Sequence, residues 1–113
     1  MKVLVLGASG YVGKPVTQEL VKNGHIVIGQ TRSAEKARAL EALEVYPIVA
    51  DPSDPSQWQD KIADVDVVVD ALGGDGSETG PLVLDAVVKA AQQARPHGPA
   101  LGFVCACRLP LLR

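Results

Sequence analysis

An apolar run that leads directly into three evenly spaced glycines limits this chain to few folds. Val3 to Leu6 favour a β-strand, and Gly7, Gly10 and Gly13 follow it. A parallel strand ending at Gly7 predicts a tight turn, because glycine takes backbone conformations that other residues avoid. Gly10 lacks the Cβ that would hold a pyrophosphate away from the backbone, and Gly13 lets the next helix approach the sheet. The pattern predicts a dinucleotide-binding turn between a strand and a helix.

The helix after this turn is expected to begin near Gly10 or Tyr11, with Val12 and Val16 on its apolar face. Its unpaired N–H groups and positive dipole end would face the phosphates, so no basic side chain is needed there. Ser9, Tyr11 and Val12 therefore join the three glycines as candidate cofactor contacts. The alternative is a glycine-rich turn without a ligand.

The segment Gly7-Ala8-Ser9-Gly10-Tyr11-Val12-Gly13 resembles the fingerprint of the short-chain dehydrogenase/reductase superfamily. The likeness is to its extended and atypical branches, which include epimerase/dehydratase-like and NmrA-like proteins. This resemblance implies an NAD(P)-binding Rossmann-like domain and covers residues 1–104.

Composition narrows the class of protein further. The chain has 113 residues, 47% hydrophobic and 21% charged, with a formal net charge of −2. We therefore expect one globular domain. The scattered basic residues argue against nucleic-acid binding, and no apolar stretch is long enough to cross a membrane. The amino-terminal residues lack the pattern of a signal peptide, which favours a cytoplasmic location. The sequence does not indicate an oligomeric state.

Strand and helix patterns alternate along the chain, as in a parallel sheet covered on both faces. Strands are expected over residues 2–6, 25–31, 45–50, 66–71 and 101–105. Helices are expected over residues 11–22, 34–43, 56–62 and 80–94, with stops or caps at Asn23-Gly24, Ser33 and Asp54. Right-handed connections then predict a doubly wound α/β sheet of about five strands in the order 3-2-1-4-5.

This order places a cofactor crevice between the first and fourth strands. The glycine turn borders the crevice on one side, and Ala71, Leu72 and Gly73 border it on the other. For the second group, an ordinary flexible loop is the competing interpretation. Asp70 lies within an apolar strand, where a carboxylate needs a partner, and we assign it no catalytic role.

The end of the second strand decides which dinucleotide is preferred, because it reaches the adenosine ribose. It reads Gln30-Thr31-Arg32-Ser33, and no Asp or Glu occurs between Lys22 and Ala34. A guanidinium and a hydroxyl can hold a 2′-phosphate, whereas an acidic residue would accept a hydrogen bond from a free 2′-hydroxyl. Arg32 and Ser33 therefore favour NADP(H) over NAD(H), unless Arg32 is an ordinary surface residue. The resemblance to NmrA-like and atypical reductases also implies NADP at this arginine.

Asp51 follows the third strand and resembles the acidic residue that contacts the adenine ring in extended members of the superfamily. A turn or helix cap is an equally good explanation for Asp51.

No catalytic residue can be assigned from the sequence. The superfamily resemblance implies a Tyr-x-x-x-Lys pair, in which the tyrosine is the general acid or base. Tyr11 and Tyr46 are followed four positions later by Pro15 and Ala50. Residues 105–113 read as an atypical tail instead of the expected catalytic segment, so we expect a truncated form of a longer family fold.

Three interpretations of function remain open. The chain derives from a reductase or epimerase-like enzyme, is a non-catalytic NADP-sensing module, or is an inactive product. Cys105 and Cys107 make a poor zinc site without further ligands, and no metal is expected. His25 and His97 are expected at the surface.

Overall fold

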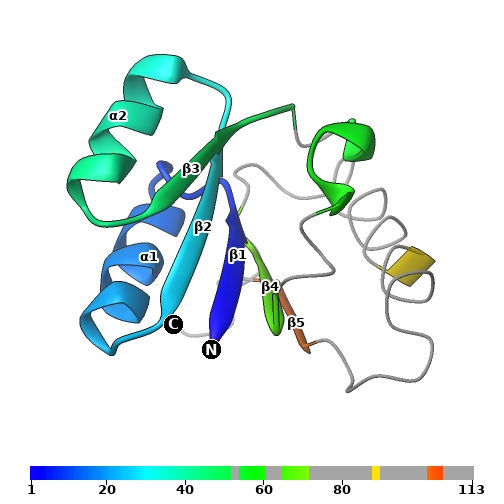
Figure 1. Ribbon diagram of the computed structural model, residues 1–113, viewed down its shortest axis with the longest axis horizontal. Helices are drawn as coiled ribbons and strands as arrows, with labels where there is room; N and C mark the ends of the chain where they lie inside the picture. Colours follow the sequence, from blue (N-terminus) through cyan, green and yellow to red (C-terminus); the bar gives the residue numbers. More distant parts are fainter. Residues whose placement is uncertain (52–53, 61–64, 72–87, 90–101, 106–113) are drawn as a thin grey trace.

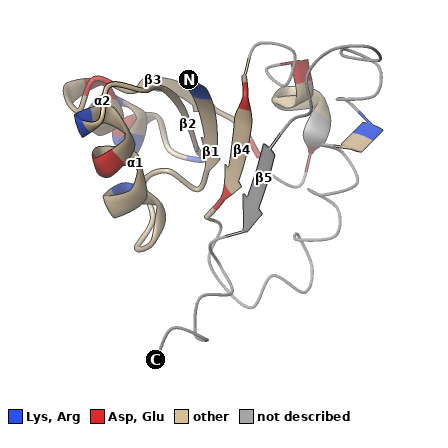
Figure 2. Ribbon diagram, turned by 90° about the horizontal axis from the view of Figure 1, so that it is seen from below, with Lys and Arg blue, Asp and Glu red and all other residues tan. Residues whose placement is uncertain are grey.

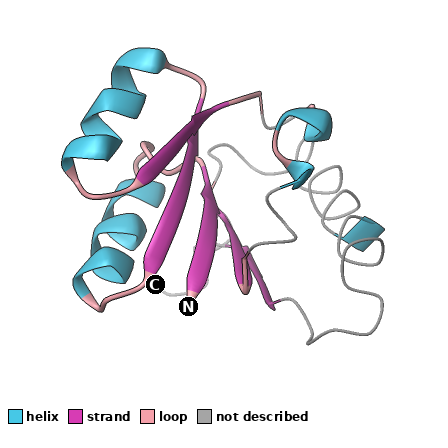
Figure 3. Cartoon of the chain, in the orientation of Figure 1, coloured by secondary structure: helices cyan, strands magenta, loops and turns pink. Residues whose placement is uncertain are grey.

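A single sheet flanked by helices organises the chain (Figures 1 and 3). The computed structural model describes residues 1–51, 54–60, 65–71, 88–89 and 102–105. In chain order its elements are β1 (Lys2–Leu6), α1 (Gly13–Lys22), β2 (Ile26–Thr31), α2 (Ala34–Ala42), β3 (Tyr46–Val49), the 3-10 helix η1 (Pro55–Gln57), β4 (Val67–Asp70) and β5 (Gly102–Cys105).

The sheet has five strands in the order β3-β2-β1-β4-β5, and every neighbouring pair is parallel. This confirms the predicted doubly wound topology. After β3 the chain returns past β2 and β1 to add β4 on the other side of β1, so the winding direction reverses there. At the carboxyl ends, Leu6 of β1 is in register with Gln30 of β2 and with Asp70 of β4.

The helices α1 and α2 cover the same face of the sheet, and η1 lies on the opposite side (Figures 1 and 2). Right-handed crossovers explain the arrangement, because the steps from β1 to β2 and from β2 to β3 run in one direction and the return to β4 runs in the other. Basic and acidic residues are interspersed along α1 and α2 (Figure 2).

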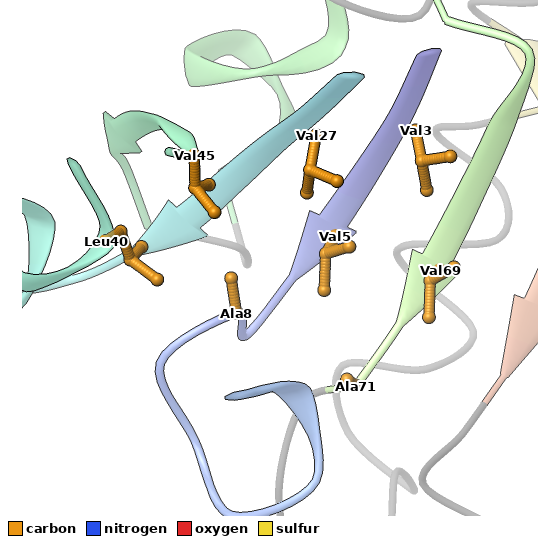
Figure 4. Packing of buried hydrophobic residues seen from close by; sticks show 8 residues of the cluster. All are labelled: Val3, Val5, Ala8, Val27, Leu40, Val45, Val69 and Ala71. Atoms are coloured by element: carbon orange, nitrogen blue, oxygen red, sulfur yellow. The ribbon is translucent and has the colours of Figure 1, made fainter. Parts of the chain in front are cut away.

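The hydrophobic core on the α1 and α2 face is built mostly from small β-branched side chains (Figure 4). Its buried members are Val3, Val5, Ala8, Val27, Leu40, Val45, Val69 and Ala71. Val3 to Leu6 of the central strand are all buried, although successive side chains point to opposite faces. Both faces of β1 are therefore covered, as its continuous apolar sequence predicts.

The element boundaries differ from the expected ones in two informative places. Helix α1 begins at Gly13, later than the predicted start near Gly10 or Tyr11, because the glycine turn continues through that segment. The segment expected to form an α-helix over 56–62 begins as the 3-10 helix η1, in which the Gln57 N–H donates to Asp54 O at 3.1 Å. The Ser56 hydroxyl donates a hydrogen bond to the Asp54 carboxylate, and this bond lowers the pKa of Asp54.

Several predicted features lie outside the described residues. They include most of the helix expected over 80–94, the crevice residues Leu72 and Gly73, and residues 106–113 of the tail expected over 105–113. In the part of the chain that is described, no helix is long and apolar enough to cross a membrane.

Candidate functional site

The three glycines form the tight turn that the sequence predicts, between the end of β1 and the start of α1. Gly7 has a φ of +78°, a left-handed conformation that favours glycine. The Gly10 N–H donates to Gly7 O at 3.1 Å, and the Lys14 N–H donates to Gly10 O at 3.0 Å. Val12 occupies the N-cap of α1 and gives no side-chain hydrogen bond. In the first turn of α1, the Lys14 N–H is therefore already bonded to Gly10 O and Pro15 carries no N–H, so the Gly13 N–H is the group that no side chain caps.

Gly10 and Gly13 have different structural reasons for being glycine. A Cβ at Gly13 would lie 1.9 Å from Gly7 O and 3.0 Å from Ala8 Cα, so the helix rests directly on the turn. A Cβ at Gly10 would meet Gly7 O at 3.4 Å, which is close to ordinary contact. The fold therefore requires glycine at Gly13, whereas packing within the described residues scarcely restricts Gly10.

The remaining side chains of the turn differ in exposure. Tyr11 is 97% exposed and contributes nothing to the core, whereas Val12 is half-buried and packs against it. An exposed aromatic ring beside an uncapped helix start is available for contact with a ligand.

A buried hydrogen-bond bridge that the sequence reasoning missed holds the turn against the ends of β2 and β3. Gln30 is 1% exposed; its Oε1 accepts from the Gly7 N–H at 2.7 Å, and its Nε2 donates to Ala50 O at 2.6 Å. A second link joins Ser9 Oγ and Thr31 Oγ1 at 3.0 Å. Polar residues in a strand due to be buried need partners, which is the signal that could have identified Gln30 and Thr31.

Arg32 and Asp51 lie next to each other at the carboxyl ends of β2 and β3. The Ala50 N–H donates to Thr31 O at 3.0 Å, which holds the two chain segments together. The Arg32 Nη2 atom is 3.8 Å from Asp51 Oδ1, and the two side chains are 68% and 51% exposed. The Arg32 guanidinium therefore faces solvent beside the Asp51 carboxylate. The distance between their closest atoms is too long for a hydrogen bond.

Ser33 takes the capping role that the sequence predicts. Its side chain accepts from the Lys36 N–H at 3.3 Å at the start of α2. The hydroxyl of Ser33 is thus a cap as well as a candidate phosphate contact.

The Asp51 N–H donates to Gln57 Oε1 at 2.8 Å, so the chain after β3 is held by the segment that contains η1.

The end of β4 forms the other side of the candidate site. The Ala71 N–H donates to Leu6 O at 2.9 Å, and Asp70 and Ala71 are 2% and 4% exposed. This brings Ala71 next to the end of β1, as predicted. Leu72 and Gly73 lie outside the described residues.

The arrangement defines a class of site. Three features meet at one edge of the parallel sheet, where the winding direction reverses. They are the positive-φ glycine after β1, the start of α1 without a capping side chain, and the polar groups at the ends of β2 and β3. Doubly wound sheets bind nucleotides at this edge. Within the described residues, no group of three or more His, Cys, Asp or Glu residues is placed to hold a metal ion.

Comparison with known proteins identifies the family. Residues 7–97 match the NAD(P)H-binding family, and the chain belongs to it. An uncharacterized protein of Saccharomyces cerevisiae is 43% identical over 44 residues, which are 39% of this chain and 15% of that protein. An isoflavone reductase homolog of Nicotiana tabacum is 28% identical over 81 residues, covering 65% of this chain and 26% of that protein. The matched regions are therefore about a quarter or less of these relatives' lengths.

Solved structures share the fold. The yeast methylglyoxal/isovaleraldehyde reductase Gre2, complexed with NADPH, superposes with a TM-score of 0.67 at 21% identity, covering 83% of this chain and 33% of that protein. The predicted resemblance to extended and atypical short-chain dehydrogenases/reductases is confirmed at the level of an NAD(P)-binding domain.

Proposed function

We propose that this chain binds NADP(H) in preference to NAD(H), with the pyrophosphate at the glycine turn and the 2′-phosphate at Arg32. The observation that carries the preference is the exposed Arg32 guanidinium at the end of β2, where the cofactor ribose lies in this class of sheet. A guanidinium can donate two parallel hydrogen bonds to the 2′-phosphate of NADP(H). The neutral 2′-hydroxyl of NAD(H) carries no charge to attract the guanidinium. The NADPH bound by the structurally similar yeast reductase supports the proposal.

The proposed cofactor contacts fall into three groups around the sheet edge. The pyrophosphate and nicotinamide side is assigned to the turn, the adenosine side to the ends of β2 and β3, and the remaining side to the segment after β4. The residues are Gly7, Ser9, Gly10, Tyr11, Val12 and Gly13; Arg32, Ser33 and Asp51; and Ala71, Leu72 and Gly73. We take residues 1–104 as the cofactor-binding unit and 105–113 as an atypical tail, of which Cys105 still belongs to β5, in a protein of the cytoplasm.

We assign no catalytic residue within these 113 residues. The relatives include an isoflavone reductase homolog. Hydride transfer to or from the nicotinamide, in a longer protein that contains this cofactor site, is therefore the first candidate activity. A non-catalytic NADP-sensing module is the second candidate function. Such a module would use the glycine turn and Arg32 without a catalytic residue.

A comparison of two cofactors tests the preference. NADPH and NADH are titrated separately into the chain, and binding is followed by the fluorescence of each cofactor. The variant is Arg32→Ala, and the matched control is Arg38→Ala, at an exposed position of α2. Loss of charge-assisted hydrogen bonds to the 2′-phosphate predicts that Arg32→Ala weakens NADPH binding about 10- to 100-fold. The control should leave binding unchanged. Equal affinities for the two cofactors, unaltered by Arg32→Ala, would contradict the 2′-phosphate assignment.

A further inference from the structure

The carboxylate nearest to Arg32 belongs to Asp51, and it lies on the adenosine side of the candidate site. The two residues follow adjacent parallel strands, and the register pairs Thr31 with Val49 just before them. Their closest charged atoms, Arg32 Nη2 and Asp51 Oδ1, are 3.8 Å apart. Any anion that binds the guanidinium therefore enters a space already next to a negative charge.

We propose that Asp51 is a specificity-determining residue that competes with the cofactor 2′-phosphate for Arg32 and so limits the preference for NADP(H) over NAD(H). This inference rests on the proposed function, since it concerns the same adenosine site. In the absence of phosphate the guanidinium pairs with the carboxylate. Binding of NADP(H) replaces that contact with a phosphate contact, whereas NAD(H) brings no competing anion.

The geometry supports an exchangeable pair. Both side chains are more than half exposed, and the separation exceeds hydrogen-bonding distance, so the attraction between them is screened by water. A phosphate that carries more charge and accepts two guanidinium hydrogen bonds can displace a partner held this loosely. The backbone of Asp51 is anchored, because its N–H donates to Gln57 Oε1 at 2.8 Å. The carboxylate therefore stays near the guanidinium after the exchange and repels the incoming phosphate.

Other roles for Asp51 predict different effects on the two cofactors. A contact with the adenine ring is made equally by NADPH and NADH, because the two molecules differ only at the 2′ position. A carboxylate that holds Arg32 in a binding-ready orientation would favour NADPH. Competition alone predicts that removing the charge favours NADPH over NADH.

The experiment measures the ratio of NADPH affinity to NADH affinity in the full chain and in Asp51→Asn, which keeps the shape of the side chain. The control is Asp60→Asn, which removes the same charge from an exposed residue beyond η1. From the attraction expected for an exposed charge pair and the repulsion of a nearby phosphate, the ratio should rise about threefold to tenfold in Asp51→Asn. It should stay unchanged in Asp60→Asn. In the Arg32→Ala background, Asp51→Asn should raise the ratio less than it does in the unsubstituted chain, because the competition for the guanidinium is gone and only the repulsion between carboxylate and phosphate remains.

The outcomes separate the inference from the proposed function. An unchanged or lowered ratio in Asp51→Asn, while the unsubstituted chain still prefers NADPH, would overturn the competition and leave the proposed function standing. A similar rise in Asp60→Asn would also overturn it, because the effect would then come from total charge. Failure of the unsubstituted chain to bind either cofactor would overturn both. Far-UV circular dichroism of each variant checks that the exposed substitutions leave the fold intact.

Discussion

Two glycines of the turn separate the needs of the fold from those of the ligand. The missing Cβ of Gly13 allows α1 to rest on Gly7 and Ala8, since an added carbon would lie 1.9 Å from Gly7 O. An added carbon at Gly10 would lie 3.4 Å from the same oxygen, and Gly10 does not have a positive φ. At Gly10 the fold can accept a side chain that the proposed pyrophosphate cannot.

This contrast predicts opposite results for two alanine substitutions. Gly13→Ala should lower the free energy of unfolding by about 1–3 kcal/mol or more, because the methyl overlaps backbone atoms. Gly10→Ala should change it by less than about 0.5 kcal/mol and weaken NADPH binding about tenfold, because the methyl occupies the phosphate approach. Chemical denaturation and NADPH titration measure the two effects. Unimpaired NADPH binding by a folded Gly10→Ala chain would argue against a pyrophosphate at this turn.

Gln30 marks the limit of what the sequence predicts, because its place in a buried strand signals that it needs hydrogen-bond partners but does not say which residues they are. The positions of Gly7 and Arg32 follow from a local pattern, because turn conformation and strand ends are set by neighbouring residues. The bridge from Gly7 through the Gln30 side chain to Ala50 joins three strand ends, and only the sheet register brings them together. The closeness of Arg32 and Asp51 likewise depends on the parallel pairing of β2 with β3.

At the scale of whole elements, α1 and α2 end with the same arrangement of backbone hydrogen bonds. The residue with a positive φ in this arrangement is a glycine after α1 and a glutamate after α2. After α1, the N–H groups of Gly24 and His25 donate to Val21 O and Leu20 O. After α2, those of Glu44 and Val45 donate to Glu41 O and Leu40 O. Both are Schellman motifs. Gly24 has a φ of +85° and Glu44 a φ of +65°, the latter being unfavourable for a residue with a Cβ.

Glu44→Gly should therefore stabilise the protein. Relief of the left-handed strain, partly offset by the greater freedom of glycine in the unfolded chain, predicts a gain of about 0.5–1 kcal/mol. Thermal unfolding followed by circular dichroism measures it, with Glu44→Ala as the control that removes the charge but keeps the Cβ. Equal melting temperatures for the glycine and alanine variants would show that Glu44 carries no backbone strain.

Element boundaries were harder to predict than the elements themselves. The stop at Gly24 and the cap at Ser33 are confirmed, because each depends on one residue and its own backbone. Helix α1 begins later than its sequence pattern predicts, since Val12 gives no capping side chain and the glycine turn extends to Gly13. The 3-10 form of η1 depends on how the Asp54 and Gln57 side chains fold back on each other, for which the sequence has no periodic pattern.

At the scale of the whole molecule, the strand order could be predicted because the alternation of strands and helices admits few right-handed windings. The observed order β3-β2-β1-β4-β5 brings the glycine turn, Arg32 and Ala71 to one edge although they are distant in sequence. The opposite edge carries the helix ends at Gly24 and Glu44, which precede β2 and β3. A ligand of the proposed kind should therefore affect one edge of the sheet alone.

The most direct test of NADP(H) binding at this edge is a titration of the isotope-labelled chain with NADPH, followed by amide chemical shifts in nuclear magnetic resonance spectra. The account predicts saturable shifts for the amides of Gly7, Gly10, Gly13 and Arg32, with those of Gly24 and Glu44 unmoved. The absence of shifts at millimolar NADPH, or shifts concentrated at the Gly24 and Glu44 edge, would contradict it.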